Sequence, residues 1–422
     1  MLTLTYLRER RDSVISSLAK RGLDVTGSVD RILELDASRR GIQKDLDDTL
    51  AESNVLSRKI GELMREGKRE EAEGVKSATS GLKEKTGTLR DKMSSLENEV
   101  HELLSHLPNT PSDMVVAGKS AEDNEEVGSW GEKPDLGDHN KPHWDIAKEK
   151  DLIDFELGSK VTGAGFPFYK GKGAKLQRGL IRFFLDYADD AGYTEYIPPL
   201  MINAESGFGT GQLPDKEGQM YHMPVDDLYM IPTAEVPLTN IYRDTMVNAS
   251  DFPIKLCGYT PCFRREAGSY GKDVRGLNRL HQFDKVEIVQ IQHPDKSAET
   301  LDSMVDHVKG LLEALELPYR ILRLCAGDMG FTAAMTYDFE VWSAAQERWL
   351  EVSSVSNFET FQSNRLKCRF KGADGKNQLV HTLNGSALAL PRIVAALLEN
   401  HQDADGVKMP KALVPYVGFD RI

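Results

Sequence analysis

The sequence predicts an α+β protein, with an N-terminal antiparallel α-helical coiled-coil hairpin followed by a larger domain that contains a β-hairpin. Residues 28–107 contain no proline and carry apolar residues at alternating steps of three and four, which is typical of a coiled coil. Residues 262–287 form two strand-like runs around a glycine-rich segment, which indicates a β-hairpin. With 422 residues, 40% of them hydrophobic, the chain can bury a large core. We therefore expect one domain of roughly 300 residues plus an appended element.

Composition excludes several classes of protein. The formal net charge of −13 argues against a protein that coats nucleic acid indiscriminately, although local basic clusters can still bind RNA. The four cysteines form no CxxC pair and no histidine cluster has zinc spacing, so we expect free thiols in a reducing compartment. The N-terminus lacks a basic start followed by an apolar core, and no run is long enough to cross a bilayer. We therefore expect a cytoplasmic protein that does not enter membranes.

The predicted coiled coil has two seams. The first runs from Ile32 to Leu63 and the second from Val75 to Leu107, and a glycine-containing segment, residues 65–68, breaks the register between them. Two helices folded back on each other satisfy this pattern, each on the order of 50 to 60 Å long. On pattern alone, a dimerisation or partner-binding coiled coil is favoured over RNA binding.

Prolines and turn residues divide the chain. Pro108 and Pro111 stop the second helix, because proline lacks the amide donor and restricts the residue before it. The acidic and Gly/Pro/Asp-rich stretch that follows is typical of a loop. The predicted divisions are a helical hairpin over 1–110, a linker over 111–150 and a large domain over 151–422.

Two glycine clusters invite a phosphate-loop interpretation. Residues 163–165 and 171–175 match neither the P-loop spacing nor a GxGxxG after a strand, so that interpretation fails. We interpret these glycines as turns that lead into a helix over Leu176–Ala191. A short strand ending at Pro198 and Pro199 follows the helix.

The β-hairpin carries the side chains with the clearest chemistry. Period-two alternation puts Phe283, Lys285 and Glu287 on one face of its second strand, with Phe283 and Glu287 roughly 13 Å apart. That span suits an elongated ligand with a flat ring at one end and a polar group at the other. Arg264 and Arg265 end the first strand, and arginine suits phosphate oxygens. Glycines and turn residues separate the strands and predict a long mobile loop: Gly268, Gly271, Asp273, Gly276 and Asn278. Periodicity alone favours a surface hairpin with a solvated charged loop.

The order of residues in this hairpin favours a ligand-binding site over a solvated surface hairpin. Residues 263–266 read Phe-Arg-Arg-Glu, and residues 281–287, after a variable loop, read His-Gln-Phe-Asp-Lys-Val-Glu. This closely resembles motif 2 of the class II aminoacyl-tRNA synthetases, in the form seen in the seryl-tRNA synthetases. The helix and proline-ended strand near residues 176–199 are similar to motif 1, which forms the dimer interface in that family. Residues 233–235, Thr-Ala-Glu, resemble its serine-recognition segment.

Residues 381–400 resemble motif 3 as a strand, a turn and an apolar helix. In the motif, Arg392 would pack on adenine and reach the γ-phosphate. Ala387 and Pro391 stand where the family often has glycine. Proline is tolerated in a first helical turn. Together with the N-terminal helical hairpin, the resemblance covers essentially the whole chain. It implies a mixed, mainly antiparallel sheet with flanking helices.

The resemblance implies a role for each site residue. Serine would be held by Thr233, Ala234, Glu235, Arg264, Glu287 and Ser386. ATP would be held by Arg264, Arg265, Glu266, Leu280, Phe283, Glu351, Val352, Ser353, Ser354 and Arg392. Arg264 and Arg392 would be the catalytic residues. Mg²⁺ would be bound by Glu351 and Ser354, and because strict alternation puts these two on opposite faces, the strand must end or bulge there.

The family's activity follows as an expectation. The resemblance implies a homodimeric, ATP-dependent serine–tRNA ligase that uses Mg²⁺, forms seryl-adenylate from L-serine and ATP, and charges tRNA(Ser) and the selenocysteine tRNA, tRNA(Sec). Two other classes stay open. A paralogue could activate serine but load a protein carrier, and a coiled-coil adaptor could carry a degenerate domain. The adaptor would not need Arg264, Glu287 and Arg392 all intact.

Overall fold

The computed structural model describes residues 1–266 and 275–422 and separates into two compact units. The first comprises Met1–Ala19 and Leu23–Pro108, and the second comprises Lys20–Gly22 and Asn109–Ile422. Within the described ranges, none of the helices combines the length and apolar character that a membrane span needs.

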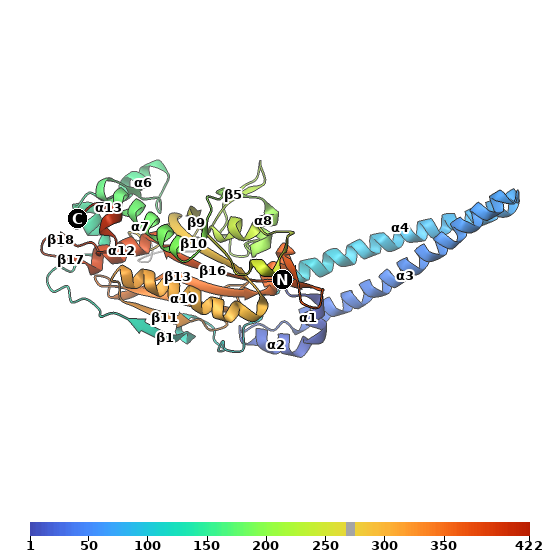
Figure 1. Ribbon diagram of the computed structural model, residues 1–422, viewed down its shortest axis with the longest axis horizontal. Coiled ribbons are helices and arrows are strands. Elements are labelled where there is room, and N and C mark those ends of the chain that lie inside the picture. Colours follow the sequence, from blue (N-terminus) through green and yellow to red (C-terminus); the bar gives the residue numbers. More distant parts are fainter. Residues whose placement is uncertain (267–274) are drawn as a thin grey trace. The chain divides into compact units, whose positions relative to one another are not determined.

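The first unit is helical. Its helices are α1 (Leu4–Glu9), α2 (Arg11–Ala19), α3 (Thr26–Arg65) and α4 (Arg69–His106). The long helices α3 and α4 run antiparallel along each other (Figure 1). Gly67 turns the chain between them with φ +79°, a left-handed conformation that favours glycine. The predicted antiparallel helical hairpin is therefore confirmed.

The two short helices α1 and α2 pack against the start of α3, a feature that the seams did not predict. Leu7, Val14 and Leu18 are fully buried there. Asp36 on α3 is also buried and accepts a hydrogen bond of 2.9 Å from Arg8 of α1. A buried carboxylate needs such a partner, so this ion pair ties α1 to the hairpin.

The second unit is built on a sheet of eight strands in its described part. In spatial order they are β1 (Glu125–Trp130), β11 (Tyr319–Arg323), β12 (Met335–Ser343), β13 (Arg348–Glu359), β16 (His381–Ala389), β10 (Gln282–Gln292), β9 (Ile254–Phe263) and β4 (Thr194–Glu195). Neighbouring strands pair antiparallel, except that β4 pairs parallel with β9. The predicted mixed, mainly antiparallel sheet is confirmed.

Short strands and helices surround this sheet. The other strands are β2 (Ile153–Asp154), β3 (Phe168–Tyr169), β5 (Met201–Ile202), β6 (His222–Met223), β7 (Leu228–Met230), β8 (Met246–Val247), β14 (Arg369–Lys371), β15 (Asn377–Leu379), β17 (Gln402–Asp403) and β18 (Gly406–Val407). The α-helices are α5 (His143–Glu149), α6 (Phe155–Val161), α7 (Gly171–Asp190), α8 (Ala204–Thr210), α9 (Glu235–Asn240), α10 (Ser297–Ala314), α11 (Thr360–Leu366), α12 (Leu390–Asn400) and α13 (Val414–Val417).

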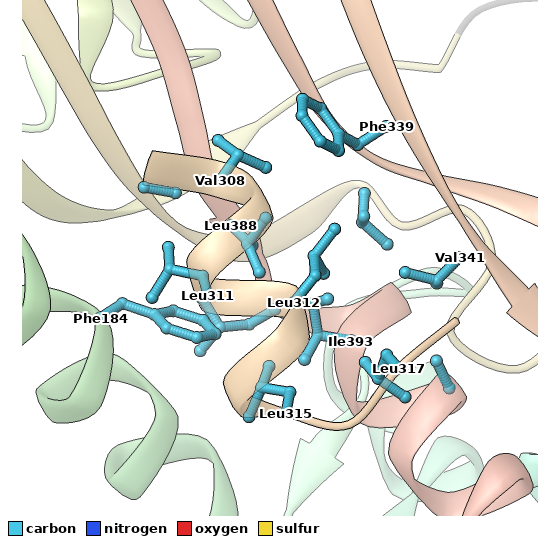
Figure 2. Close-up of a cluster of buried hydrophobic side chains, with 14 of the residues drawn as sticks. Phe184, Val308, Leu311, Leu312, Leu315, Leu317, Phe339, Val341, Leu388 and Ile393 are labelled. Atoms are coloured by element: carbon cyan, nitrogen blue, oxygen red, sulfur yellow. The ribbon is translucent and has the colours of Figure 1, made fainter. Parts of the chain in front are cut away.

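The main core lies where α7, α10 and α12 pack against the sheet. Figure 2 shows α10 with Leu311 and Leu312 among Phe184, Phe339 and Ile393. These side chains are fully buried, and burial of each is worth about 1.5 to 3 kcal/mol relative to exposure. On the opposite face of the sheet, Leu238 of α9 packs against Leu256 and Val289, and polar side chains lie further along the strands.

Two local predictions were wrong. Helix α7 begins at Gly171 rather than at Leu176, so Gly171 and Gly173 lie in its first turn. The other glycine cluster, residues 163–165, does lie before the helix. A Cβ on Gly173 would lie 2.2 Å from the carbonyl oxygen of Leu152, so close packing explains this glycine. No separate turn divides motif 3, because β16 stays paired with β10 to Ala389 and α12 starts at the next residue. The first turn of α12 contains Pro391, as expected.

Candidate functional site

Strands β9 and β10 form the predicted hairpin, in register from Ile254–Ile291 to Phe263–Gln282. Alternation along β10 is also as predicted. Phe283, Lys285 and Glu287 line cavities, whereas Val286 and Ile288 point into the core under the helices. Three of the predicted loop residues, Gly268, Gly271 and Asp273, lie outside the described residues. The core therefore lies behind β10, and the side chains on the opposite face of this strand line the cavities.

Two adjoining cavities lie on this open face. One is lined by Arg264, Glu266, Leu277, Asn278, Arg279, Leu280, Phe283, Lys285, Glu351, Val352, Ser353, Ser386, Ala389, Pro391 and Arg392. The other is lined by Gln212, Glu217, Gln219, Pro232, Thr233, Glu235, Arg264, Glu266, Arg279, Lys285, Glu287, Glu351, Ser354, Ser356, Asn384 and Ser386. Both linings contain the cations Arg264, Arg279 and Lys285 and the carboxylates Glu266 and Glu351, so charges of both signs lie where the cavities meet.

The first cavity combines a flat ring with arginines. The guanidinium carbon of Arg264 lies 5.2 Å from the ring centre of Phe283, a cation–π contact that holds the arginine in place. Arg392, from the first turn of α12, donates to the carbonyl oxygens of Asn278 at 3.0 Å and Glu351 at 2.6 Å. This arrangement can take a planar base beside Phe283 and anionic oxygens between the two arginines.

The second cavity is a buried polar pocket. Oε2 of Glu287 accepts a hydrogen bond of 3.1 Å from the hydroxyl of Thr233 and lies 2.5 Å from Nζ of Lys285. Oε1 of Glu287 is buried and has no hydrogen-bond partner among the described residues. The Thr233 hydroxyl also accepts from the backbone amide of Glu235 at 3.2 Å, and Thr233 lies one residue before Ala234, the N-cap of α9. The pocket thus holds a buried acceptor, Oε1 of Glu287, that a small polar ligand can satisfy.

Glu235 adds a second buried carboxyl group to this pocket. Its pKa is raised to about 7, mainly by burial and also by the nearby Glu287, although a hydrogen bond from Gln362 opposes the rise. That bond joins Nε2 of Gln362 to Oε1 of Glu235 at 2.7 Å. Two close carboxyl groups in a buried site favour a cationic ligand such as an ammonium group.

The strand with the expected metal ligands does bulge. Along β13, Ser353 pairs with Phe339 but Glu351 pairs with Glu340, so Val352 is an extra residue. A bulge changes which face the following side chains occupy. Glu351 and Ser354 consequently line the same cavity, which resolves the conflict that strict alternation created.

These residues fit a magnesium ion that binds mainly to phosphates. In the described ranges no three His, Cys, Asp or Glu side chains form a metal cluster. Mg²⁺ commonly takes one or two protein oxygens and completes its shell with phosphates and water. Asp338 on β12 pairs with Ser354 across the strands, and its buried Oδ1 has no hydrogen-bond partner among the described residues. Burial and the charge of Glu351 raise the pKa of Asp338. The local excess of carboxyl oxygens therefore suits a cation.

Most of the predicted site residues line these cavities, and two do not. The Ala234 side chain is buried in a separate apolar cluster with Leu238 and Val289. The side chain of Arg265 is exposed and lines neither cavity, because it follows Arg264 in an extended segment and points the other way.

Sequence reasoning missed several polar side chains that line the site: Gln212, Glu217, Gln219, Asn278, Arg279, Ser356 and Asn384. Asn384 lies two residues before Ser386 on the same strand, so the period of two could have found it. Gln212, Glu217 and Gln219 come from a loop after α8, where no period applies.

Comparison with known proteins decides the family. A family model described as the "tRNA synthetase class II core domain (G, H, P, S and T)" matches residues 221–401, and the "Seryl-tRNA synthetase N-terminal domain" matches residues 1–111. A protein of Salinibacter ruber named "Serine--tRNA ligase" is 53% identical and aligns over 100% of this chain and 99% of its own length. The chain belongs to the seryl-tRNA synthetase family. Another family member, from Chlorobaculum parvum, is 46% identical over the full length of both chains.

Solved structures of seryl-tRNA synthetases have the same fold. The "seryl-tRNA synthetase from Pyrococcus horikoshii complexed with ATP" superposes with a TM-score of 0.92 at 34% identity, covering 100% of this chain and 99% of that one. The "cytoplasmic Serine-tRNA ligase from Naegleria fowleri in complex with AMP" has a TM-score of 0.85 at 26% identity, covering 97% and 94%. Of the two positions that depart from the family's glycines, Pro391 lines the first cavity and Ala387 is buried in the core.

Proposed function

We propose that this chain is a cytoplasmic, ATP-dependent serine–tRNA ligase that forms seryl-adenylate from L-serine and ATP and transfers serine to tRNA(Ser) and to tRNA(Sec). The observation that carries the proposal is the pair of adjoining cavities. One presents an aromatic ring and arginines, the other presents buried carboxyl groups, and Arg264 lies in both linings. A nucleotide and a small amino acid bound in these cavities would meet at Arg264.

We call the second cavity the serine pocket. In it, each polar group of serine would meet a side chain of suitable charge or hydrogen-bonding role. Glu235 and Thr233 would bind the ammonium group, and Oε1 of Glu287 with Ser386 would meet the hydroxyl group. Arg264 would hold the carboxylate against the α-phosphate. Each polar end of serine then has a partner of opposite charge or hydrogen-bonding role.

Adenylation needs little acid–base chemistry, because the serine carboxylate is already ionised. Its oxygen attacks the α-phosphorus in line, a new O–P bond forms, and the bond to the pyrophosphate oxygen breaks. Arg264 would stabilise charge on the α-phosphate, and Arg392 charge on the leaving pyrophosphate. Mg²⁺ held by Glu351 and Ser354 would neutralise phosphate charge. The terminal ribose hydroxyl of the tRNA then attacks the adenylate carbonyl and releases AMP.

The helical hairpin of the first unit would bind tRNA. Its seam is satisfied internally, and the candidates to contact phosphates are exposed basic residues: Arg40, Lys44, Arg58, Lys59, Arg65, Lys68 and Arg69. Of these, Arg40 also pairs with Asp36 and Lys68 with Glu66. We assign this role to residues 1–110 and catalysis to 151–422, with 111–150 as the linker.

A homodimer is the proposed assembly. The segment that resembles motif 1 exposes apolar side chains after β4, with Ile197 92% and Tyr196 36% exposed. Apolar side chains gathered at an open sheet edge are typical of an association surface.

Serine-dependent exchange of labelled pyrophosphate into ATP tests the proposal. Exchange together with charging of tRNA(Ser) is the expected result. Exchange without charging of any tRNA would instead favour the paralogue that loads a protein carrier. Absence of exchange from folded protein would favour the adaptor and overturn the proposal.

A further inference from the structure

Gln362, on α11, connects three parts of the chain behind the serine pocket. Its side chain is buried, and Nε2 donates to the carbonyl oxygen of Thr210 at 3.2 Å and to Oε1 of Glu235 at 2.7 Å. Oε1 of Gln362 accepts from the hydroxyl of Thr382 on β16 at 2.8 Å. All hydrogen-bonding atoms of the amide therefore have partners.

The orientation of this amide follows from its partners. The carbonyl oxygen of Thr210 can only accept, so the NH₂ group of Gln362 must face it, and the amide oxygen must then face Thr382. The hydrogen bond from this NH₂ group to Oε1 favours the ionised form of Glu235 and so opposes the rise in its pKa that burial causes.

Glutamine also suits this position chemically. The position requires a group with two N–H donors and a neighbouring carbonyl acceptor. Glutamine and asparagine both supply this group, and glutamine has the longer side chain. Thr210 ends α8, and Gln212, two residues later, lines the serine pocket. The Gln362 amide therefore joins a wall of the pocket to its buried carboxylate.

We infer that Gln362 is a positioning residue that holds the Glu235 carboxylate ready for the ammonium group of the amino acid, and that Thr382 sets the orientation of the Gln362 amide. The inference deepens the proposed function and rests on it. Gln362 acts through Glu235, so it should affect ligands that carry an ammonium group and spare those that lack it.

Two inhibitors that differ in one group test this selectivity. One is a non-hydrolysable seryl-adenylate analogue, and the other is the same compound without the α-amino group. In the Gln362→Met variant we expect the amino-bearing analogue to bind about 10- to 100-fold more weakly, because a hydrogen bond to a charged group is lost. The analogue without the amino group should bind within about twofold of its wild-type affinity.

Thr382 provides a matched pair of milder variants, should Gln362→Met fail to fold. Thr382→Ser keeps the hydroxyl donor, and Thr382→Val replaces it with a methyl group of similar size. We expect Thr382→Val to raise the KM for serine about three- to tenfold with little change in the KM for ATP, and Thr382→Ser to match the wild type.

The outcomes separate this inference from the proposed function. If the wild-type chain fails to exchange pyrophosphate, the proposed function is wrong. If the wild type exchanges but Gln362→Met and Thr382→Val weaken both analogues equally, Gln362 has only a structural role. Unchanged binding of the amino-bearing analogue in both variants would also overturn the inference.

Discussion

Nδ1 of His143 lies 2.7 Å from Oε1 of Glu399, and both side chains are fully buried. The backbone amide of Leu277 donates to Nε2 of His143 at 2.9 Å, so the ring carries its proton on Nδ1 and donates it to Glu399. Ser343 donates to the other carboxylate oxygen. Burial raises the pKa of Glu399, but hydrogen bonds from His143 and Ser343 outweigh it and lower the pKa overall. The pair ties α5 and α12 to the segment before β10, next to the carbonyl of Asn278 that binds Arg392.

Glu399→Ala should therefore destabilise the protein by about 3 kcal/mol, because it leaves several buried donors unpaired. Urea unfolding measures the loss. Glu399→Gln keeps the acceptor oxygen and should cost less. Glu122→Ala, at an exposed position, is the control, and equal stability of Glu399→Ala and Glu122→Ala would refute the role of the pair.

Arg264→Ala should lower the rate of pyrophosphate exchange about 100- to 1,000-fold, since Arg264 would meet charge that develops in the transition state. Its thermal midpoint should change little, because among the described residues the Arg264 side chain interacts with the Phe283 ring and, weakly, with the Pro232 carbonyl oxygen. Arg265→Ala is the matched control, an exposed arginine at the next position that lines neither cavity. A fully active Arg264→Ala enzyme would remove Arg264 from the chemistry.

Glu287→Ala should abolish most of the preference for serine over alanine. A pocket built to bind a hydroxyl group leaves its own buried polar atoms unpaired when alanine enters, a discrimination on the order of 10⁴-fold. Exchange driven by each amino acid measures the preference. Glu287→Gln, which keeps an acceptor, should lose less of it. If Glu287→Ala still prefers serine as strongly as the wild type, Glu287 does not contact the hydroxyl.

The KM for serine should depend on pH through Glu235. Its pKa of about 7 means that the ionised form, which binds ammonium, is dominant above pH 7 and is lost as the pH falls. Between pH 8 and pH 6 the KM should rise about tenfold. Glu235→Gln should have a high KM that does not vary over this range. A wild-type KM that is flat from pH 8 to pH 6 would contradict ammonium binding by ionised Glu235.

Shortening the helical hairpin of α3 and α4 should affect tRNA charging and not adenylate formation. Replacing residues 46–86 with a short glycine turn keeps the base of the hairpin, where Arg31 pairs with Glu99 at 2.7 Å. Serine-dependent exchange should survive and tRNA charging should collapse. Affinity of the intact enzyme for tRNA should also fall steeply with salt. If the shortened enzyme charges tRNA(Ser) at the wild-type rate, the hairpin serves another partner.

Local periodicity in the sequence was enough to predict many features of this molecule. The seams of α3 and α4, the register break near Gly67, and the face shared by Phe283, Lys285 and Glu287 all follow from spacing along one strand or helix. The ordered motifs then identified the family, because residues with a shared chemical role recur in a set order.

Spatial neighbours were decided by the tertiary structure. The sequence by itself showed that Glu351 and Ser354 needed a bulge, but only the pairing of β13 with β12 put it at Val352. Nothing in the spacing of Gln362, Thr382 and Glu235 joins them, because they come from α11, β16 and α9 and meet only after the sheet and its covering helices have packed. The start of α7 likewise could not be predicted from spacing. Gly173 is explained by close packing against the Leu152 carbonyl oxygen and not by a turn. Periodicity reports which face a side chain occupies, whereas packing between distant segments decides what lies opposite it.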